Sequence, residues 1–237
     1  MANIYYDQDA NLELVTDKVV AIIGYGNQGR AQALNMRDSG VKKIIIGSRE
    51  DGSYEQAIED GFEVFPIADA CKKADIIFML LPDEFAPKIF EESIVPGLEE
   101  GNIINFASAY NITFHKIVPP KFVDVVMAAP RMIGDGVREL YIRGEGSPAF
   151  VGVAQDASGM ALEYGKALCK AIGATKKGAI EVKFDDETCL DLMTEQGIWP
   201  IIYHVFNEAF KLHVKMGHPE EAVLMEEYVS KEPMYMM

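Results

Sequence analysis

Short apolar runs alternate with helical patterns along most of the chain. The runs that predict strands lie at residues 19–23, 44–46, 62–64, 74–81, 103–106, 123–128 and 148–154. Patterns with helical spacing lie between them, at residues 31–37, 55–60, 67–73, 86–94 and 158–172. Such an alternation is typical of a parallel sheet with helices on both faces, so we predict an α/β fold for this part of the chain.

The pattern changes after about Phe184. From residue 187 to residue 214 no strand pattern with turn signals occurs, and Glu187, Asp191 and Glu195 recur every four residues, which places them on one helical face. We expect Pro200 to kink or break this helix. The predicted domains are therefore residues 1–183, with the sheet, and residues 184–237, which are helical.

The helical segment is too short to form a large core. A domain of about 50 residues buries little surface by itself. Either it packs against a partner subunit, or the natural chain is longer than these 237 residues. Because a partner would cover its apolar surface, we expect a homodimer or a larger homo-oligomer.

Composition and charge exclude several classes of function. The apolar share is 49% and the net charge is −15, so the chain can bury a core but should repel nucleic-acid backbones and anionic membranes. The longest apolar stretches, residues 76–81 and 125–130, are too short to span a bilayer. Three cysteines without a C-x-x-C pair favour reduced thiols and a cytoplasmic location. A small anionic ligand remains compatible with this charge, since helix N-termini bind anions locally.

A glycine-rich loop follows the first predicted strand directly. Its sequence is Gly24-Tyr25-Gly26-Asn27-Gln28-Gly29, a G-x-G-x-x-G motif between a strand and a helix. Gly24 permits the tight turn, Gly26 lets the backbone approach a pyrophosphate, and Gly29 lets the helix pack closely on the strand. The motif and its context predict a dinucleotide-binding fold of the Rossmann type.

The end of the second predicted strand is where the adenosine ribose would lie. Arg49, with Ser48 and Ser53, favours the 2′-phosphate of NADP, because arginine accommodates this group. Glu50 and Asp51 instead favour the free 2′-hydroxyl of NAD. We expect NADP, with NAD as the alternative.

Several motifs together resemble the ketol-acid reductoisomerase family, also called acetohydroxy acid isomeroreductases. The similarity extends over nearly the whole chain. It is carried by residues 4–7, the glycine loop with its helix (24–40), Leu80-Leu81-Pro82-Asp83-Glu84, Gly144-Glu145-Gly146-Ser147-Pro148-Ala149, Gln155-Asp156-Ala157-Ser158-Gly159 and residues 184–196.

The resemblance implies a Rossmann domain followed by an all-helical, knotted domain that takes part in the dimer and the active site. It also implies NADPH and two Mg²⁺ ions. The reaction would move an alkyl group within 2-acetolactate or its ethyl homologue and then reduce the ketone by hydride transfer, for branched-chain amino acid synthesis. The substrate would thus be a small 2-keto or 2-hydroxy acid.

The family's functional positions can be matched to residues of this chain. Asp191 and Glu195 match its first two metal carboxylates, and Glu226 is the best match to the third. Their oxygens suit Mg²⁺; a solvated acidic helix face is the alternative. The positions that match cofactor contacts are Tyr25, Gly26, Asn27, Gln28, Arg49, Ser53, Asp83, Glu84, Phe85, Ala86 and Gly134.

The chain departs from the family pattern at its catalytic positions. The family histidine in F-x-H-G-F-N is Ser108, and the lysine in A-P-K-G-P-G-H is Arg131. A serine hydroxyl cannot replace imidazole as a general base near neutral pH, although it can still form hydrogen bonds. The fourth metal carboxylate would fall near Ser230, which is not an acid. We expect His115, His204, His213 and His218 to be structural.

Two interpretations remain. One is a ketol-acid reductoisomerase in which Ser108 and Arg131 occupy the place of the usual catalytic pair. The other keeps the fold and the dinucleotide but changes the task, either to a reductase of another 2-keto acid or to a non-catalytic paralogue that binds cofactor or partners.

Overall fold

The computed structural model describes residues 2–49 and 52–232 and divides the chain into two units, Met1–Thr188 and Cys189–Met237. The division falls inside helix α9 (Phe184–Leu192), a few residues beyond the change in sequence pattern.

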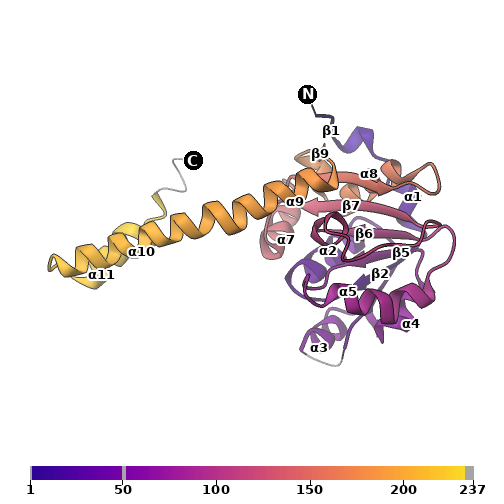
Figure 1. The fold of residues 1–237 in the computed structure, drawn as a ribbon, viewed down its shortest axis with the longest axis horizontal. Coiled ribbons are helices and arrows are strands. Elements are labelled where there is room, and N and C mark those ends of the chain that lie inside the picture. Colours follow the sequence, from indigo (N-terminus) through magenta and orange to yellow (C-terminus); the bar gives the residue numbers. More distant parts are fainter. Residues whose placement is uncertain (1, 50–51, 233–237) are drawn as a thin grey trace. The chain divides into compact units, whose positions relative to one another are not determined.

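The first unit is built on one sheet with the strand order β1-β9-β8-β7-β6-β5-β2-β3-β4 (Figure 1). Strands β4-β3-β2-β5-β6-β7 are all parallel, which confirms the Rossmann-type prediction. Beyond them the sheet is mixed, because β8 runs antiparallel to β7 and β1 antiparallel to β9. The strands are β1 Ile4–Tyr5, β2 Val19–Ile23, β3 Lys43–Gly47, β4 Glu63–Phe65, β5 Ile76–Met79, β6 Ile103–Phe106, β7 Asp124–Pro130, β8 Ala149–Gln155 and β9 Ala179–Glu181.

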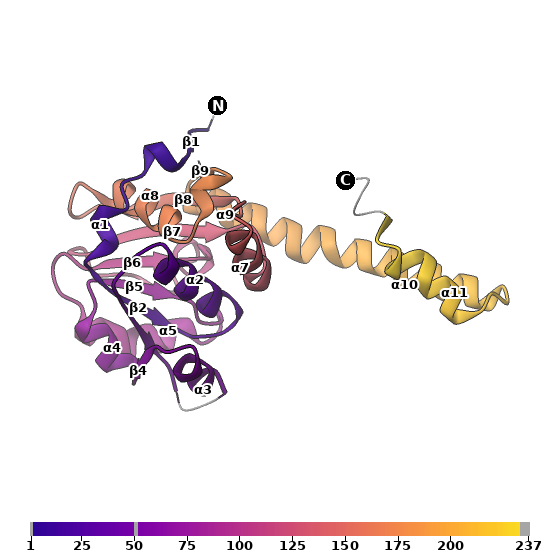
Figure 2. The ribbon, with the colours of Figure 1, turned by 180° about the vertical axis from the view of Figure 1, so that it is seen from behind.

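Helices cover both faces of this sheet. Helices α1, α2 and α8 pack on one face (Figure 2), and α4 and α5 pack on the other (Figure 1). Strand β2 serves both cores, since Val20 and Ile22 face the first set of helices while Ala21 and Ile23 face the second. The helices are α1 Glu13–Thr16, α2 Asn27–Asp38, α3 Gly52–Glu59, α4 Ile67–Lys73, α5 Ala86–Ile89, α6 Tyr110–Thr113, α7 Gly134–Ile142 and α8 Ala161–Ala171.

The short N-terminal strand β1 is fixed to β9 by side chains as well as by backbone pairing. The Tyr5 hydroxyl donates to Glu181 Oε2 at 2.6 Å, and Asn3 Nδ2 donates to the same oxygen at 2.8 Å. The hydrogen bond to Glu181, together with burial, raises the pKa of Tyr5 to about 12. Tyr5 therefore stays protonated well above the pH at which a free tyrosine ionises.

We expect Tyr5→Phe to lower the free energy of unfolding at pH 8 and to have less effect as the pH rises. The raised pKa stabilises the folded wild type fully below about pH 10, the unfolded value, and this contribution is lost as the pH rises towards about 12. Urea unfolding of the wild type and of Tyr5→Phe from pH 8 to pH 11 measures this difference in stability. The control is Tyr203→Phe, since Tyr203 is exposed. A difference that is constant over this range would contradict the assignment.

The second unit is helical. Helix α9 runs into a π-helical stretch, Met193–Ile198, and then into α10 (Trp199–Lys215). Pro200 therefore does not break the helix; it lies in the first turn of α10, and the change of helix type in the preceding turn accommodates its missing N–H.

Helix α11 (Glu220–Leu224) and a π-helical stretch, Met225–Val229, return against α10. The ring of Tyr228 lies 5.7 Å from that of Phe206 and 6.5 Å from that of Phe210. Within residues 2–49 and 52–232, no helix is both long enough and apolar enough to cross a bilayer.

Candidate functional site

A cavity of about 530 Å³ lies at the carboxyl ends of the parallel strands, where β2 and β5 are neighbours. Strands β3 and β4 lie on one side of β2, and β5, β6 and β7 lie on its other side. Doubly wound sheets bind their ligands in the crevice at the carboxyl ends of the two strands where the chain changes sides. The cavity is lined by the glycine loop, the ends of β3 and β5, and the turn after β6. The lining residues include Gly24, Tyr25, Gly26, Asn27, Gln28, Ser48, Arg49, Ser53, Leu81, Pro82, Ala107 and Ser108.

The three glycines of the loop have different structural roles. Gly24 has φ +94°, and a Cβ atom there would lie 2.5 Å from the Leu80 carbonyl oxygen. A Cβ atom on Gly29 would lie 2.0 Å from the Gly24 carbonyl oxygen. A Cβ atom on Gly26 would meet no protein atom within 4 Å. The fold itself thus excludes a side chain at Gly24 and Gly29, while the space beside Gly26 is open to a ligand.

Two helices begin beside this loop. Helix α2 starts at Asn27 and α7 starts at Gly134, where an added Cβ atom would lie 2.1 Å from the Asn27 carbonyl oxygen. Asp135 N donates to Asn27 Oδ1 at 3.2 Å, and Gln28 Nε2 donates to the Met132 carbonyl oxygen at 2.8 Å. The positive ends of both helix dipoles therefore favour an anion such as a pyrophosphate.

A second cavity, of about 730 Å³, shares Arg49 with the first. Glu84, Phe85 and Lys88 line it together with Tyr54 of α3. The structure thus brings Arg49 together with the segment after β5, as the family resemblance implies. Glu50 and Asp51, which bear on the choice between NADP and NAD, lie outside the described residues.

Asp83 and Ala86, the other two predicted cofactor contacts after β5, make contacts within the protein. Ala86 is the first residue of α5 and is buried in the core. Asp83 Oδ1 accepts a hydrogen bond of 2.7 Å from Asn111 Nδ2, which joins this segment to the one after β6. Asn111 is 3% exposed, so it fixes the two loops relative to each other.

Ser108 and Arg131 lie at the ends of adjacent strands. Ser108 follows β6 and lines the first cavity, and its Oγ accepts a long hydrogen bond, 3.4 Å, from Tyr110 N. Arg131 follows β7, and its guanidinium lies 4.9 Å from the centre of the Phe150 ring. The parallel register of β6 and β7 therefore places both predicted catalytic residues at one edge of the sheet.

Glu187 connects these two strand ends, a role that the sequence does not reveal. It is 1% exposed; its Oε1 accepts from Arg131 Nη1 at 2.7 Å and its Oε2 accepts from Ala109 N at 2.9 Å. A buried carboxylate in this position holds both the guanidinium and the turn after Ser108. In the sequence, Glu187 is marked only by its four-residue spacing from Asp191 and Glu195. This spacing predicts that the three residues share one helix face, but it does not show that Glu187 is buried.

The three predicted metal ligands all lie in the helical unit. Asp191 is in the last turn of α9, Glu195 is in the π-helical stretch that follows, and Glu226 is an exposed residue of Met225–Val229. The regular α-helical spacing expected for Asp191 and Glu195 is therefore interrupted at Glu195. No group of three or more His, Cys, Asp or Glu side chains in the described part of the chain is arranged to hold a metal ion.

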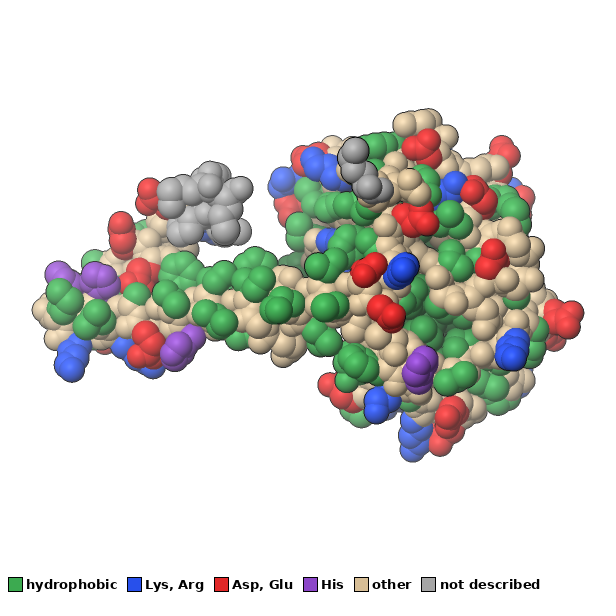
Figure 3. Space-filling model, turned by 45° about the horizontal axis from the view of Figure 1, so that its top comes forward, with side chains coloured by type: hydrophobic (Ala, Val, Ile, Leu, Met, Phe, Trp, Pro, Cys, Tyr) green, Lys and Arg blue, Asp and Glu red, His purple; other side chains and the backbone are tan. Residues whose placement is uncertain are grey.

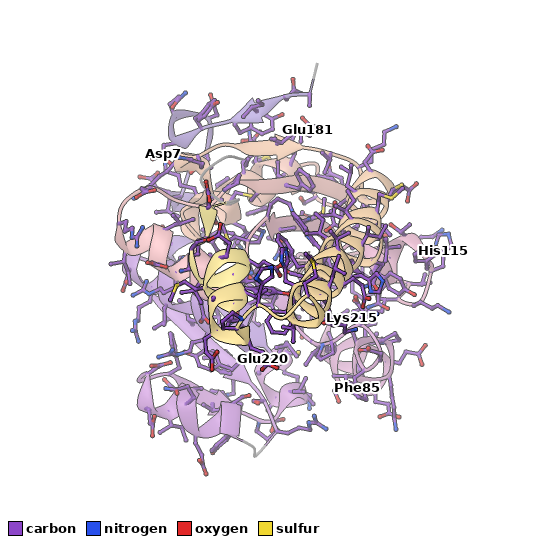
Figure 4. All side chains as sticks on the ribbon, turned by 90° about the vertical axis from the view of Figure 1, so that its left-hand side faces the viewer. Asp7, Phe85, His115, Glu181, Lys215 and Glu220 are labelled. Atoms are coloured by element: carbon purple, nitrogen blue, oxygen red, sulfur yellow. The ribbon has the colours of Figure 1, made fainter. Side chains whose placement is uncertain are left out.

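None of the four histidines lines either cavity. His115 has the left-handed φ of 51° and lies at the periphery of the first unit (Figure 4). In the helical unit the rings of His213 and His218 are 5.5 Å apart, and His213 Nε2 lies 3.9 Å from Glu227 Oε1. His213 and His218 therefore contact each other within the helical unit.

Comparison with known proteins agrees with this geometry. Residues 14–178 match the model of the acetohydroxy acid isomeroreductase NADPH-binding domain. The ketol-acid reductoisomerase (NADP(+)) of Pyrobaculum aerophilum is 47% identical over 232 residues, which covers 95% of this chain and 69% of that protein. The corresponding protein of Pyrococcus abyssi is 45% identical over 228 residues, 95% of this chain and 68% of the relative.

A solved structure is also closely similar. It is that of an NADH-preferring ketol-acid reductoisomerase from an uncultured archean, with a TM-score of 0.94 and 39% identity over 97% of this chain and 71% of that one. Sequence and structure therefore agree: the chain belongs to the ketol-acid reductoisomerase family, the NAD(P)H-dependent oxidoreductases of branched-chain amino acid biosynthesis.

Proposed function

We propose that this protein is a Mg²⁺-assisted ketol-acid reductoisomerase that prefers NADPH and acts on 2-acetolactate or its ethyl homologue in the cytoplasm. The observation that carries the proposal is the convergence of the glycine loop, Arg49 and the Arg131–Glu187 pair at the carboxyl edge of one parallel sheet. A bound nicotinamide would supply the hydride. Preference for NADPH rests on Arg49 and Ser53, which line the first cavity.

The chain's own residues would bind and orient the reactants. The open space at Gly26 and the starts of α2 and α7 would receive the pyrophosphate. Ser108 can donate a hydrogen bond to a substrate oxygen, but its hydroxyl cannot serve as a general base near neutral pH. Arg131, held by Glu187, contributes a fixed positive charge beside developing negative charge.

The absence of the family histidine supports a second candidate function. Reduction of a simple 2-keto acid needs a hydride donor and a polarised carbonyl, and it does not need the alkyl migration of 2-acetolactate. With Ser108 at the histidine position, a reductase of another 2-keto acid is the alternative; a paralogue that binds cofactor without turnover is the third possibility.

The decisive experiment is oxidation of NADPH by the full-length protein with 2-acetolactate and Mg²⁺. We expect turnover, and a higher kcat/KM with NADPH than with NADH. Turnover only with other 2-keto acids would replace the proposal with the second candidate, and NADPH binding without any turnover would favour the paralogue. A clear preference for NADH would contradict the roles given to Arg49 and Ser53.

The metal ligands support Mg²⁺ only in part. Asp191 and Glu195 offer hard carboxylate oxygens, which suit this ion. Because the described residues of one chain hold no complete site, we propose that Glu226 of a second copy adds a ligand in a homodimer. The helical unit exposes many large apolar side chains that such a dimer would cover (Figure 3), among them Met193, Ile201, Tyr203, Val205, Leu212 and Met216.

We expect Asp191→Asn to weaken Mg²⁺ binding at least about tenfold, because an amide oxygen lacks the charge that a hard cation prefers. Isothermal titration of the apoprotein with Mg²⁺ measures this directly. The matched control is Asp185→Asn, an exposed carboxylate in the first turn of the same helix. If Asp191→Asn binds Mg²⁺ as tightly as wild type, the metal assignment is wrong.

A further inference from the structure

Asp60, which directly follows helix α3, is bound by three side chains from another part of the unit. Its Oδ2 accepts from the Tyr25 hydroxyl at 2.9 Å and from Arg30 Nε at 2.7 Å, and its Oδ1 accepts from Arg30 Nη2 at 3.0 Å. Its carbonyl oxygen accepts from Arg37 Nη1 at 2.6 Å. The Asp60 side chain is 13% exposed and that of Arg30 is 47% exposed, so the carboxylate is mostly buried while the guanidinium reaches water.

The partners of Asp60 belong to the pyrophosphate side of the cavity. Tyr25 is the residue between the first two glycines of the loop, and Arg30 and Arg37 lie on α2. The Tyr25 side chain packs into the core of the unit, where its ring lies edge-on to that of Phe62 with 5.8 Å between ring centres. Tyr25 is 3% exposed, so it acts as an anchor of the loop rather than as a contact surface.

Helix α3 belongs to the other side of the same cavity. It begins at Gly52, and Ser53 in its first turn lines the cavity together with Arg49. Asp60 follows the last residue of α3, and Gly61, with φ +84°, then turns the chain into β4. The hydrogen bonds of Asp60 therefore fix the carboxyl end of α3 relative to the glycine loop and α2.

The charges in this cluster keep it in one protonation state. The Arg30 guanidinium, with help from Tyr25, holds the pKa of Asp60 below its usual range. Burial and the Asp60 carboxylate raise the pKa of Tyr25. At neutral pH a charged carboxylate thus accepts from a neutral phenol and a guanidinium, which is the strong arrangement for such bonds.

We infer that Asp60 is a positioning residue for the dinucleotide, which sets the spacing between the pyrophosphate-binding glycine loop and the 2′-phosphate-binding start of α3. The inference rests on the cofactor site proposed above. NADPH contacts both segments at once, so an error in their spacing weakens its binding although Asp60 touches no part of it. Once the cofactor is bound, the reacting groups are unchanged.

The test compares Asp60→Asn and Tyr25→Phe, singly and together. We expect Asp60→Asn to weaken NADPH binding about tenfold and Tyr25→Phe about threefold, as judged by fluorescence titration. The double variant should bind about as weakly as Asp60→Asn alone, because both changes break the same link. At saturating NADPH, the kcat of Asp60→Asn should stay within about twofold of wild type, since only binding depends on the spacing.

Controls separate positioning from general stability. Asp17→Asn removes an exposed ion pair with Lys42, 2.6 Å long, and should leave NADPH affinity unchanged. Asp17 precedes the amino end of β2, whereas the glycine loop follows the carboxyl end of this strand. If Asp60→Asn does not fold, Tyr25→Phe decides alone, because it keeps the ring and the Asp60–Arg30 pair.

Each contrary outcome overturns the inference. Unchanged NADPH affinity in Asp60→Asn, or in Tyr25→Phe, would do so. Losses of NADPH affinity that simply add in the double variant would do so as well, because they would show that Asp60 and Tyr25 contribute to binding independently. Failure of the wild type to bind NADPH would remove both the inference and the proposed cofactor site, and is seen before any variant is made.

Discussion

Gly26→Ala will bind NADPH at least about thirtyfold more weakly than wild type, a loss of about 2 kcal/mol, and will unfold at nearly the same temperature. Gly26 has φ −78°, which alanine adopts without strain, and its Cβ atom would meet no protein atom within 4 Å. The new methyl group would instead occupy the space through which the backbone approaches the pyrophosphate. Fluorescence titration with NADPH and thermal unfolding of the apoprotein measure the two effects.

Gly29→Ala is the matched control, since it is the same substitution three residues later in the same motif. Its Cβ atom would lie 2.0 Å from the Gly24 carbonyl oxygen, so the loop or the helix must move. We expect a destabilisation of about 3 kcal/mol, which corresponds to a fall of about 6–12 °C in Tm. Wild-type affinity in Gly26→Ala, or wild-type stability in Gly29→Ala, would show that these roles are assigned wrongly.

Glu187→Gln should lower kcat about a hundredfold and the free energy of unfolding by about 2 kcal/mol. Glutamine has almost the same shape, so the packing is kept and the charge is lost. The Arg131 guanidinium would then lack its buried counter-charge, and the turn at Ala109 would lose a charged acceptor. We expect a smaller loss in the free energy of unfolding than for a fully buried ion pair, because the Arg131 side chain is 26% exposed.

Steady-state kinetics and urea unfolding measure both effects of Glu187→Gln. The control is Glu139→Gln, which removes the carboxylate of the pair between Glu139 and Arg143 on the solvent side of α7. Both members of that pair are exposed, so we expect a change of about 0.5 kcal/mol or less. Equal effects in the two variants would mean that the burial of Glu187 contributes nothing to stability or turnover.

Much of the first unit follows from local sequence. β-branched and apolar runs such as Val19–Ile23 form buried strands because both faces of a parallel strand are covered. The tight turn from β2 into α2 also follows from local sequence, because Gly24 has the left-handed φ of +94° and a Cβ atom on Gly29 would lie 2.0 Å from the Gly24 carbonyl oxygen. Element ends shifted by a few residues; α2, for example, begins at Asn27 rather than at residue 31, since its first turn is made by the loop residues themselves.

Other features depend on contacts between distant segments. Strand β8 has an apolar pattern like its neighbours, but only its pairing with β7 makes it antiparallel. Strand β1, Ile4–Tyr5, is too short for any periodicity and forms because β9 presents an open edge. Nothing near Glu187 or Asp60 in the sequence indicates that they are buried; their importance comes from Arg131 and from Tyr25 and Arg30, which are far from them in the sequence.

The sequence by itself determined most strands and helices of the first unit, the glycine turn between β2 and α2, and the family, because each rests on short stretches of the chain. Only the tertiary structure decided which polar groups are buried and paired. Burial is a property of the assembled layers: the desolvation of Glu187 and the link from Asp60 to the glycine loop exist only when segments that are distant in the sequence meet at the carboxyl edge of the sheet and along α2.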